Sequence, residues 1–114
     1  MEKQTLRDFQ EYREDKFTKK IVFKKEGHVA FVLNFGPGHR LPTHNHPGAT
    51  VYLTVLEGSG YMIADGMETA VATGDLVQVE GHEAFAYRSA DDSRSSLSVV
   101  LINTPSEEYA KEIG

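Results

Sequence analysis

The sequence contains no cysteine, which excludes disulfide bonds, thiolate nucleophiles and cysteine-ligated zinc from its chemistry. It also has no excess of basic residues, because 12 Lys and Arg stand against 17 Asp and Glu, for a net charge of -5. The basic residues are scattered apart from Lys19-Lys20 and Lys24-Lys25. Since binding of a phosphate backbone requires a basic face, nucleic acid is not an expected partner.

Long hydrophobic runs are missing as well. The N-terminus, Met1–Thr5, lacks the apolar segment of a signal peptide, and no run approaches the roughly 20 apolar residues of a membrane span. We therefore expect no membrane partner and take a cytoplasmic location as the default. A hydrophobic content of 39% with 25% charged residues is typical of a globular chain, and 114 residues are the usual length of one domain.

The chain has instead a series of short apolar alternations separated by Gly, Pro and Asp, which predicts an all-β fold. The expected strands span residues 20–24, 29–35, 40–46, 51–56, 61–64, 67–72, 76–80, 84–89 and 96–102. Asp65-Gly66 predicts a two-residue hairpin, because a type I′ turn needs a positive φ at both positions. Regular spacing of short strands is typical of a sandwich or a closed barrel. No repeat or linker interrupts the chain, so residues 1–114 are interpreted as one domain with a barrel core over about 20–103.

Only the two ends of the chain have a helical pattern. Thr104-Pro105-Ser106-Glu107 combines a capping box with proline at the first helical position, which predicts a short C-terminal helix over about 105–113. This helix is expected to dock Tyr109 and Ile113 on the barrel. The N-terminal stretch 1–19 is expected to form either a short helix or an arm laid across a neighbour.

His44-Asn45-His46 is the most site-like feature of the sequence. In a strand, residues i and i+2 point to the same face, so the two imidazoles would lie side by side while Asn45 points the other way. Neutral imidazole nitrogens suit Zn, Fe, Ni, Cu or Mn, but a firmly held ion needs a third or fourth ligand. Taken alone, the pattern leaves open a metal site and a pair of polar residues at the end of a strand.

The surroundings of this pair resemble the first sequence motif of the cupin family. Gly38, five further residues, His44-Asn45-His46 and then Leu56-Glu57-Gly58 at the end of the next strand carry the resemblance. The stretch Gly74–Glu80, continued by Ala84–Arg88, resembles the second motif. The resemblance implies a cupin-type double-stranded β-helix, which is a jelly-roll barrel with a ligand pocket inside its mouth. It also implies a homodimer as the expected assembly.

The metal-ligand set that the resemblance implies is incomplete in this chain. The cupin site takes two histidines and a carboxylate or glutamine from the first motif and a histidine from the second. His44 and His46 stand at the two histidine positions, but the third position falls on Thr50 or Val51 and the fourth on Phe85. Half of the usual set is missing, so a divalent ion (Zn, Fe, Ni or Mn) is expected to be weakly held if it is bound.

Two other histidines lie near this pair in the sequence. His82 lies three residues before Phe85 and would complete a metal site with His44 and His46 if its turn bends toward the mouth. An exposed loop histidine is the alternative. His39 lies five residues before His44, so in a regular strand it would face the opposite side.

The remaining candidates are pocket-lining side chains. We expect Tyr52, Tyr61, Gln78 and Phe85 to contact an organic ligand, since an apolar lining with a few polar groups is typical of a small-molecule pocket. Phe85 would fill the space in which an imidazole would otherwise reach the ion. The alternatives are core packing for the aromatic side chains and a solvent-facing position for Gln78.

Three functions follow from these candidates. The first is a barrel that binds a small organic ligand, or a weakly held divalent ion through His44 and His46, without turnover. The second is a metal-dependent dioxygenase or isomerase whose ligand set is completed by water, His82 or the substrate. The third is metal-free acid–base catalysis, with one of the two paired histidines as the base and Tyr52 or Tyr61 as the acid. The sequence favours the first, because half of the ligand set is absent.

Overall fold

The computed structural model of the chain describes residues 1–104 and 107–114. Within these residues the fold is mainly β, with nine strands and two short 3-10 helices. In chain order the elements are η1 (Leu6–Phe9), β1 (Thr18–Lys25), β2 (His28–Phe35), β3 (Arg40–His44), β4 (Thr50–Glu57), β5 (Ser59–Ala64), β6 (Met67–Ala72), β7 (Leu76–Glu80), β8 (Phe85–Ser89), β9 (Ser95–Ile102) and η2 (Glu107–Ala110). Every expected strand is present, with bounds close to those expected, so the all-β prediction is confirmed. Neither helix in the described part of the chain is long and apolar enough to cross a membrane.

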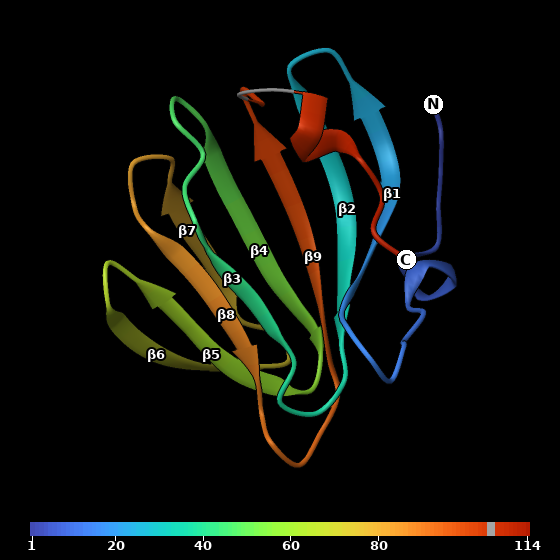
Figure 1. Ribbon diagram of the computed structural model, residues 1–114. Coiled ribbons are helices and arrows are strands. Elements are labelled where there is room, and N and C mark those ends of the chain that lie inside the picture. Colours follow the sequence, from blue (N-terminus) through green and yellow to red (C-terminus); the bar gives the residue numbers. More distant parts are fainter. Residues whose placement is uncertain (105–106) are drawn as a thin grey trace.

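The strands form two antiparallel sheets that face each other (Figure 1). The larger sheet has the order β1-β2-β9-β4-β7, and the smaller one has the order β3-β8-β5-β6. Strands distant in the sequence are therefore neighbours, with β9 between β2 and β4 and with β8 between β3 and β5. Crossing between two sheets in this way is the topology of a jelly-roll barrel, as expected.

Alternation along the strands separates the core from the surface. On β9, Leu97, Val99 and Leu101 are buried, whereas Val100 and Ile102 are each 39% exposed. The inward residues of β9 pair on either side with inward residues of β2 and β4. A continuous apolar layer therefore lines the inner face of the larger sheet.

Turn chemistry fixes the register of the hairpin between β5 and β6. Asp65 and Gly66 both have a positive φ, of 51° and 80°, as a type I′ turn requires. The turn lies between the paired residues Ala64 and Met67. The carboxylate of Asp65 accepts a hydrogen bond of 2.8 Å from the backbone N–H of Ala84. The hairpin expected at Asp65-Gly66 is therefore confirmed.

The C-terminal segment is helical over a shorter stretch than the expected 105–113, of which residues 105 and 106 lie outside the described residues. In its described residues this segment has only the short 3-10 turn η2, after which Ile113 forms an antiparallel bridge with Lys19 of β1. The backbone N–H of Ile113 donates to the carbonyl of Lys19 at 3.0 Å. Pairing with the edge of β1 satisfies backbone groups that a longer helix would satisfy internally. The expected capping box lies partly outside the described residues, but Tyr109 and Ile113 do contact the barrel as expected.

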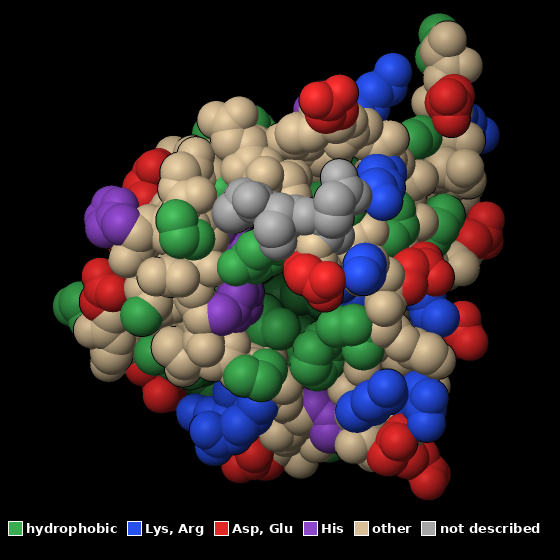
Figure 2. Space-filling view, turned by 45° about the horizontal axis from the view of Figure 1, so that its top comes forward, with side chains coloured by type: hydrophobic (Ala, Val, Ile, Leu, Met, Phe, Trp, Pro, Cys, Tyr) green, Lys and Arg blue, Asp and Glu red, His purple; other side chains and the backbone are tan. Residues whose placement is uncertain are grey.

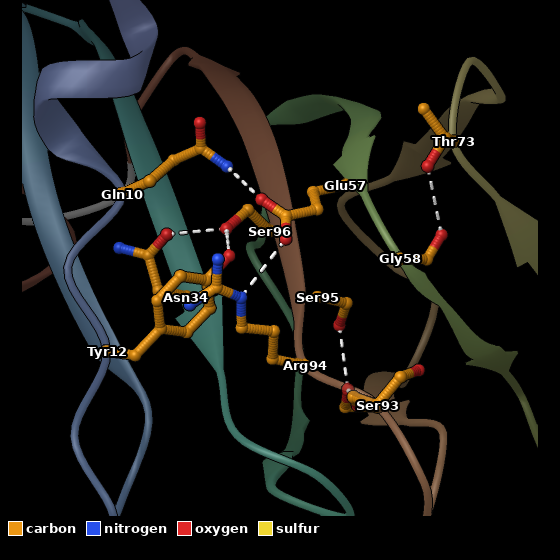
Figure 3. A network of polar contacts seen from close by, with 11 residues as sticks. Gln10, Tyr12, Asn34, Glu57, Gly58, Thr73, Ser93, Arg94, Ser95 and Ser96 are labelled. Atoms are coloured by element: carbon orange, nitrogen blue, oxygen red, sulfur yellow. Dashed lines mark hydrogen bonds and ion pairs between the residues drawn. The ribbon is translucent and has the colours of Figure 1, made fainter.

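The N-terminal stretch forms η1 and then an extended arm that lies against the larger sheet of its own chain (Figures 1 and 3). Asn34 of β2 and Ser96 of β9 are buried polar residues at the centre of this contact. The amide nitrogen of Asn34 donates to the carbonyl of Phe9 at 2.8 Å, and the hydroxyl of Tyr12 is hydrogen-bonded to that of Ser96. Of the two expected forms, a short helix is therefore present, and the arm is anchored to its own barrel.

Candidate functional site

A cavity of about 310 Å³ lies inside the barrel. Its walls come from both sheets, and the C-terminal segment supplies part of the lining. Most of the lining is apolar: Phe17, Phe31, Leu33, Leu41, Pro42, Val51, Leu53, Phe85, Val99, Leu101 and Ile113. The other lining residues are Lys19, His44, His46, Glu108 and Tyr109. Figure 2 shows this face of the molecule hollowed, with hydrophobic side chains in its depth and histidine, acidic and basic side chains around it.

Both histidines of His44-Asn45-His46 line the cavity, whereas Asn45 is exposed, as expected. Strand β3 ends at His44, however, so His46 takes its direction from the turn that follows and not from strand alternation. The two ring centroids are 4.5 Å apart, and the ring planes meet at 75°. The Nδ1 atom of His44 lies 2.7 Å from the carbonyl oxygen of Pro42. Since a carbonyl can only accept, this contact requires a proton on Nδ1, and in the neutral ring Nε2 then carries the lone pair.

A close backbone contact fixes the turn that carries His46. The backbone N–H of His46 donates to the carbonyl of Gly81 at 2.9 Å, and the carbonyl of His46 accepts from the N–H of Ala49 at 2.9 Å. A Cβ atom on Gly81 would lie 2.0 Å from the carbonyl oxygen of His46, so a side chain does not fit at this position. The turn between β7 and β8 therefore sets the position of His46.

His46 is buried, with 7% of its surface exposed, and its ring lies 5.0 Å from the ring of Tyr109, centroid to centroid. Its Nδ1 atom is buried and has no hydrogen-bond partner among the described residues. Burial, the neighbouring His44 and the charge of Lys19 lower the pKa of His46 to about 4. His46 is therefore neutral at physiological pH and brings an unsatisfied polar atom to the site.

Lys19 is a candidate functional residue that the sequence analysis missed. Its side chain lines the cavity and is 8% exposed, with Nζ 4.4 Å from the centroid of the Phe31 ring. The Nζ group also donates to the backbone carbonyl of Tyr109. Burial lowers the pKa of Lys19 to about 8, so the ammonium form still predominates at neutral pH. A signal was present in the sequence, because alternation places Lys19 on the same face as the apolar residues Phe17 and Ile21.

Glu108 is the second lining residue that the sequence analysis missed. It brings a carboxylate to the cavity from η2, and this carboxylate accepts a hydrogen bond of 3.1 Å from the ammonium group of Lys111. Both side chains of this ion pair are mostly exposed, so the pair belongs to the opening rather than to the interior. No pattern in the sequence singled out Glu108, because its place depends on how the short turn η2 lies on the barrel.

Three of the expected ligand-binding residues do not line the cavity. Tyr52 and Gln78 are a cross-strand pair on the outer face of β4 and β7, and both are exposed. Tyr61 does not line the cavity either, since its ring lies under the guanidinium group of Arg88 at 4.4 Å. Alternation is the physical reason, because the neighbours of these residues on β4, β7 and β5 take the inward positions.

Two histidines considered with the pair lie away from the cavity as well. His82, expected as a third metal ligand, is exposed in the turn between β7 and β8 and does not line the cavity. The Nδ1 atom of His39 accepts a hydrogen bond of 3.0 Å from the backbone N–H of Gly36, and its Nε2 atom lies 2.9 Å from the carbonyl oxygen of Glu14. His39 therefore connects the loop between β2 and β3 to the N-terminal arm.

The residues present do not fit a firmly held metal ion. His44 and His46 supply two nitrogen donors, and no group of three His, Asp or Glu side chains in the described part of the chain could surround an ion. Two residues at positions that the cupin motifs would give to ligands, Val51 and Phe85, present apolar side chains to the cavity instead. In addition, the ammonium group of Lys19 places a positive charge near His46, which opposes a divalent cation there.

Comparison with known proteins agrees with the fold described above. Residues 31–102 match the family model named Cupin domain. The crystal structure of TT1209 from Thermus thermophilus is similar with a TM-score of 0.85 and 24% identity, covering 90% of this chain and 98% of that one. An RmlC-like cupin protein from Desulfovibrio desulfuricans gives a TM-score of 0.81 at 20% identity, covering 90% of this chain and 97% of that one. At these identities the likeness shows the fold alone.

Among curated proteins, none matches this sequence. The match to the family model, however, spans more than half of the chain and includes both stretches that resemble the cupin motifs. It also includes the turn of His46 and the β7–β8 turn that positions it. The chain therefore belongs to the cupin domain family.

Proposed function

We propose that this cupin barrel binds a small organic molecule with a largely apolar body in its central cavity. One observation carries the proposal: a cavity of about 310 Å³ is lined by apolar side chains except for a few polar residues. These polar residues are contiguous, since Lys19 contacts Tyr109, Tyr109 contacts His46, and His46 contacts His44. A hollow of this size with a few convergent polar groups is typical of small-molecule sites.

Loose packing of the core does not account for the cavity. Protein interiors are packed about as densely as organic crystals, and voids larger than a water molecule are few. Beside the cavity this barrel is tightly packed, with the ring of Phe35 5.4 Å from that of Phe17 and 4.7 Å from that of Tyr87. Phe35 and Tyr87 are completely buried. A dense core next to a defined hollow supports a cavity that is kept for a ligand.

Binding can be tested by following the cavity methyl groups of Val51, Leu53, Val99 and Leu101 in NMR spectra while octanamide, a neutral molecule with an apolar chain, is added. We expect saturable shifts of these methyl signals. Val99→Phe places a larger ring in the cavity and should abolish the shifts, whereas Val100→Phe adds the same ring to the outer face of β9 and should preserve them. Shifts that are absent in the native protein, or that persist in Val99→Phe, would contradict the proposal.

A metal-dependent dioxygenase or isomerase has less support from the site. Two histidines without a third donor, next to the charge of Lys19, suit a divalent ion poorly. After incubation with Fe, Mn, Ni and Zn salts and removal of free metal, we expect a bound metal content far below one equivalent. One equivalent of metal that is lost in His44→Ala would favour the metal-dependent function instead.

Metal-free acid–base catalysis by a histidine and a tyrosine has no support in the arrangement of the expected partners. Tyr52 and Tyr61, the expected acids, do not line the cavity with His44 and His46. Tyr109 does line it, but its hydroxyl donates to the carbonyl of Asn45 at 2.9 Å. That hydroxyl is therefore engaged in fixing the turn after β3.

The homodimer implied by the family remains a prediction. The outer face of the larger sheet carries exposed apolar side chains that come from three different strands, namely Phe23, Tyr52, Val100 and Ile102. Light scattering coupled to size-exclusion chromatography would measure the mass of the assembly in solution. A mass of one chain at all accessible concentrations would contradict this prediction.

A further inference from the structure

We propose that the ligand of the cavity is a monocarboxylate, with an apolar chain or ring in the hollow and its carboxylate bound to the ammonium group of Lys19. This inference rests on the proposed function, because it names the class of ligand that the same cavity takes. It also assigns to Lys19 a role as the anchor for the charged end of that ligand.

Lys19 is a buried cation that no carboxylate neutralises among the described residues. Its surface is 8% exposed, and its partners are the ring of Phe31 and the backbone carbonyl of Tyr109. The next residue on β1, Lys20, differs in this respect, because it forms an ion pair of 3.6 Å with Glu11. A buried charge without a counter-ion costs free energy, and lysine is almost never fully buried unless it is paired. A ligand with a negative charge would supply the missing partner.

The geometry of Lys19 leaves room for such a ligand. An ammonium group has three N–H donors, and one of them is used on the carbonyl of Tyr109. The Nζ group lies over the face of the Phe31 ring at 4.4 Å, and both residues line the cavity. Two donors therefore remain for the two oxygens of a carboxylate, and hydrogen bonds between charged groups are among the strong ones.

The lining limits the ligand to one negative charge. Lys19 is the one Lys or Arg among the described residues that line the cavity, so a second anionic group would find no second cation. It would instead meet the carboxylate of Glu108, which is already paired with Lys111 at 3.1 Å. A dianion would therefore leave one charge unpaired or in repulsion, and a monoanion would not.

The lining also determines the rest of the ligand. Aromatic and branched side chains form most of the wall, among them Phe31, Leu53, Phe85 and Leu101. Apart from Tyr109, no side chain of Ser, Thr, Tyr, Asn or Gln lines the cavity within the described residues. A polyhydroxylated molecule such as a sugar would lose water from its hydroxyl groups and find few partners, which is unfavourable. An apolar body with a single anionic end fits both parts of the lining.

A comparison of octanoate with octanamide distinguishes the effect of the ligand's charge on binding from the effect of its shape. The two molecules share one chain and differ in the head group. Their dissociation constants are measured by calorimetry at neutral pH for the native protein, Lys19→Met and Lys20→Met. Methionine keeps an unbranched side chain but removes the ammonium group. Lys20 is the matched control because it is the neighbouring lysine and does not line the cavity.

We expect octanoate to bind the native protein at least about tenfold more tightly than octanamide, as a charge-assisted hydrogen bond would provide. In Lys19→Met this order should reverse, because a carboxylate loses more hydration than an amide and would have no counter-ion. Lys20→Met should behave like the native protein. The comparison of the two ligands on the native protein needs no variant, so the proposal can be rejected even if Lys19→Met fails to fold.

Two results would overturn the monocarboxylate assignment while leaving the proposed function in place. One is equal or tighter binding of octanamide to the native protein, with shifts of the cavity methyl groups. The other is a preference for octanoate that persists in Lys19→Met. If neither molecule binds or shifts the cavity methyl groups, both the assignment and the proposed binding function are wrong.

Discussion

The ring of Tyr109 packs against the ring of His46 with their centroids 5.0 Å apart, so the C-terminal segment closes part of the cavity wall. The hydroxyl of Tyr109 donates to the carbonyl of Asn45 at 2.9 Å, and its backbone carbonyl accepts from the ammonium group of Lys19. One residue of η2 therefore contacts both polar parts of the site, which are the turn after β3 and the inner face of β1. Tyr109 thus joins the polar lining residues Lys19 and His46, which come from different parts of the chain.

Two substitutions at Tyr109 should distinguish the contribution of its hydroxyl to stability from the contribution of its ring. Tyr109→Phe removes only the hydrogen bond to Asn45 and should lower the free energy of unfolding by about 1 kcal/mol or less. Tyr109→Ala also removes the ring that covers His46 and should cost about 2 kcal/mol, because the ring is half-buried. Urea unfolding followed by circular dichroism measures both values. Equal losses in the two variants would show that the packing of the ring against His46 contributes nothing.

The strands could be predicted from the sequence because their signals are local. Alternation of apolar and polar residues and the Asp65-Gly66 turn depend on a few neighbouring residues, and each placed its element close to its true bounds. His44 and His46 share the expected inward direction, although β3 ends at His44 and the backbone contact with Gly81 places His46. Tyr52 shows the limit of aromatic character as a signal, since it lies on a correctly predicted strand but on the outer face. Alternation, and not residue type, decides which side of a sheet a residue takes.

The polar side of the cavity could not be predicted in the same way. Alternation indicates which face of β1 Lys19 takes, but no local pattern reports its bond to the backbone carbonyl of Tyr109, 90 residues later. The expected C-terminal helix would have placed this segment differently, because Ile113 forms an antiparallel bridge with Lys19 of β1 instead. The helix signal itself came from capping residues, which describe where a helix starts and not how long it continues. Residues whose role depends on such distant contacts were therefore missed.

The buried charge of Lys19 predicts a pH-dependent cost in stability. The pKa of Lys19 is lowered from 10.5 to about 8 in the folded chain by burial. Below about pH 8 the side chain is charged in both the folded and the unfolded state, so the cost of burying the charge is fully present. Between about pH 8 and 10.5 only the unfolded chain keeps the proton, so the cost decreases as the pH rises.

Lys19→Met should therefore be more stable than the native protein at neutral pH, by about 2 kcal/mol once the lost bond to the carbonyl of Tyr109 is allowed for. This advantage should shrink toward pH 10. Urea unfolding of both proteins at several pH values gives the difference, and Lys20→Met is the control for a general effect of losing one positive charge. An advantage that does not change with pH would mean that the lysine is hydrated in the folded chain.

His46 should make the fold sensitive to acid. Burial, His44 and Lys19 lower its pKa from 6.5 to about 4, so the folded chain binds its proton less readily than the unfolded chain does. The resulting stabilisation is fully present above about pH 6.5 and is lost as the pH falls through about 4, with a total of about 3 kcal/mol. His46→Leu should remove this part of the pH dependence. His28→Ala, which changes an exposed imidazole, should retain it, and an unaltered profile in His46→Leu would refute the assignment to His46.

Gly81 is the residue whose change should disturb the turn of His46 most directly. A Cβ atom at this position would lie 2.0 Å from the carbonyl oxygen of His46 and 2.6 Å from that of Ala49, and backbone atoms cannot move aside as a flexible side chain can. Gly81→Ala should therefore lower the free energy of unfolding by about 2–3 kcal/mol, as overpacking does, and displace His46 from Tyr109. Urea unfolding measures the first effect, and the NMR signals of the His46 ring report the second. His82→Ala, which alters the next and exposed residue, should change neither, and a Gly81→Ala protein with native stability and unshifted His46 signals would show that this contact does not hold the turn in place.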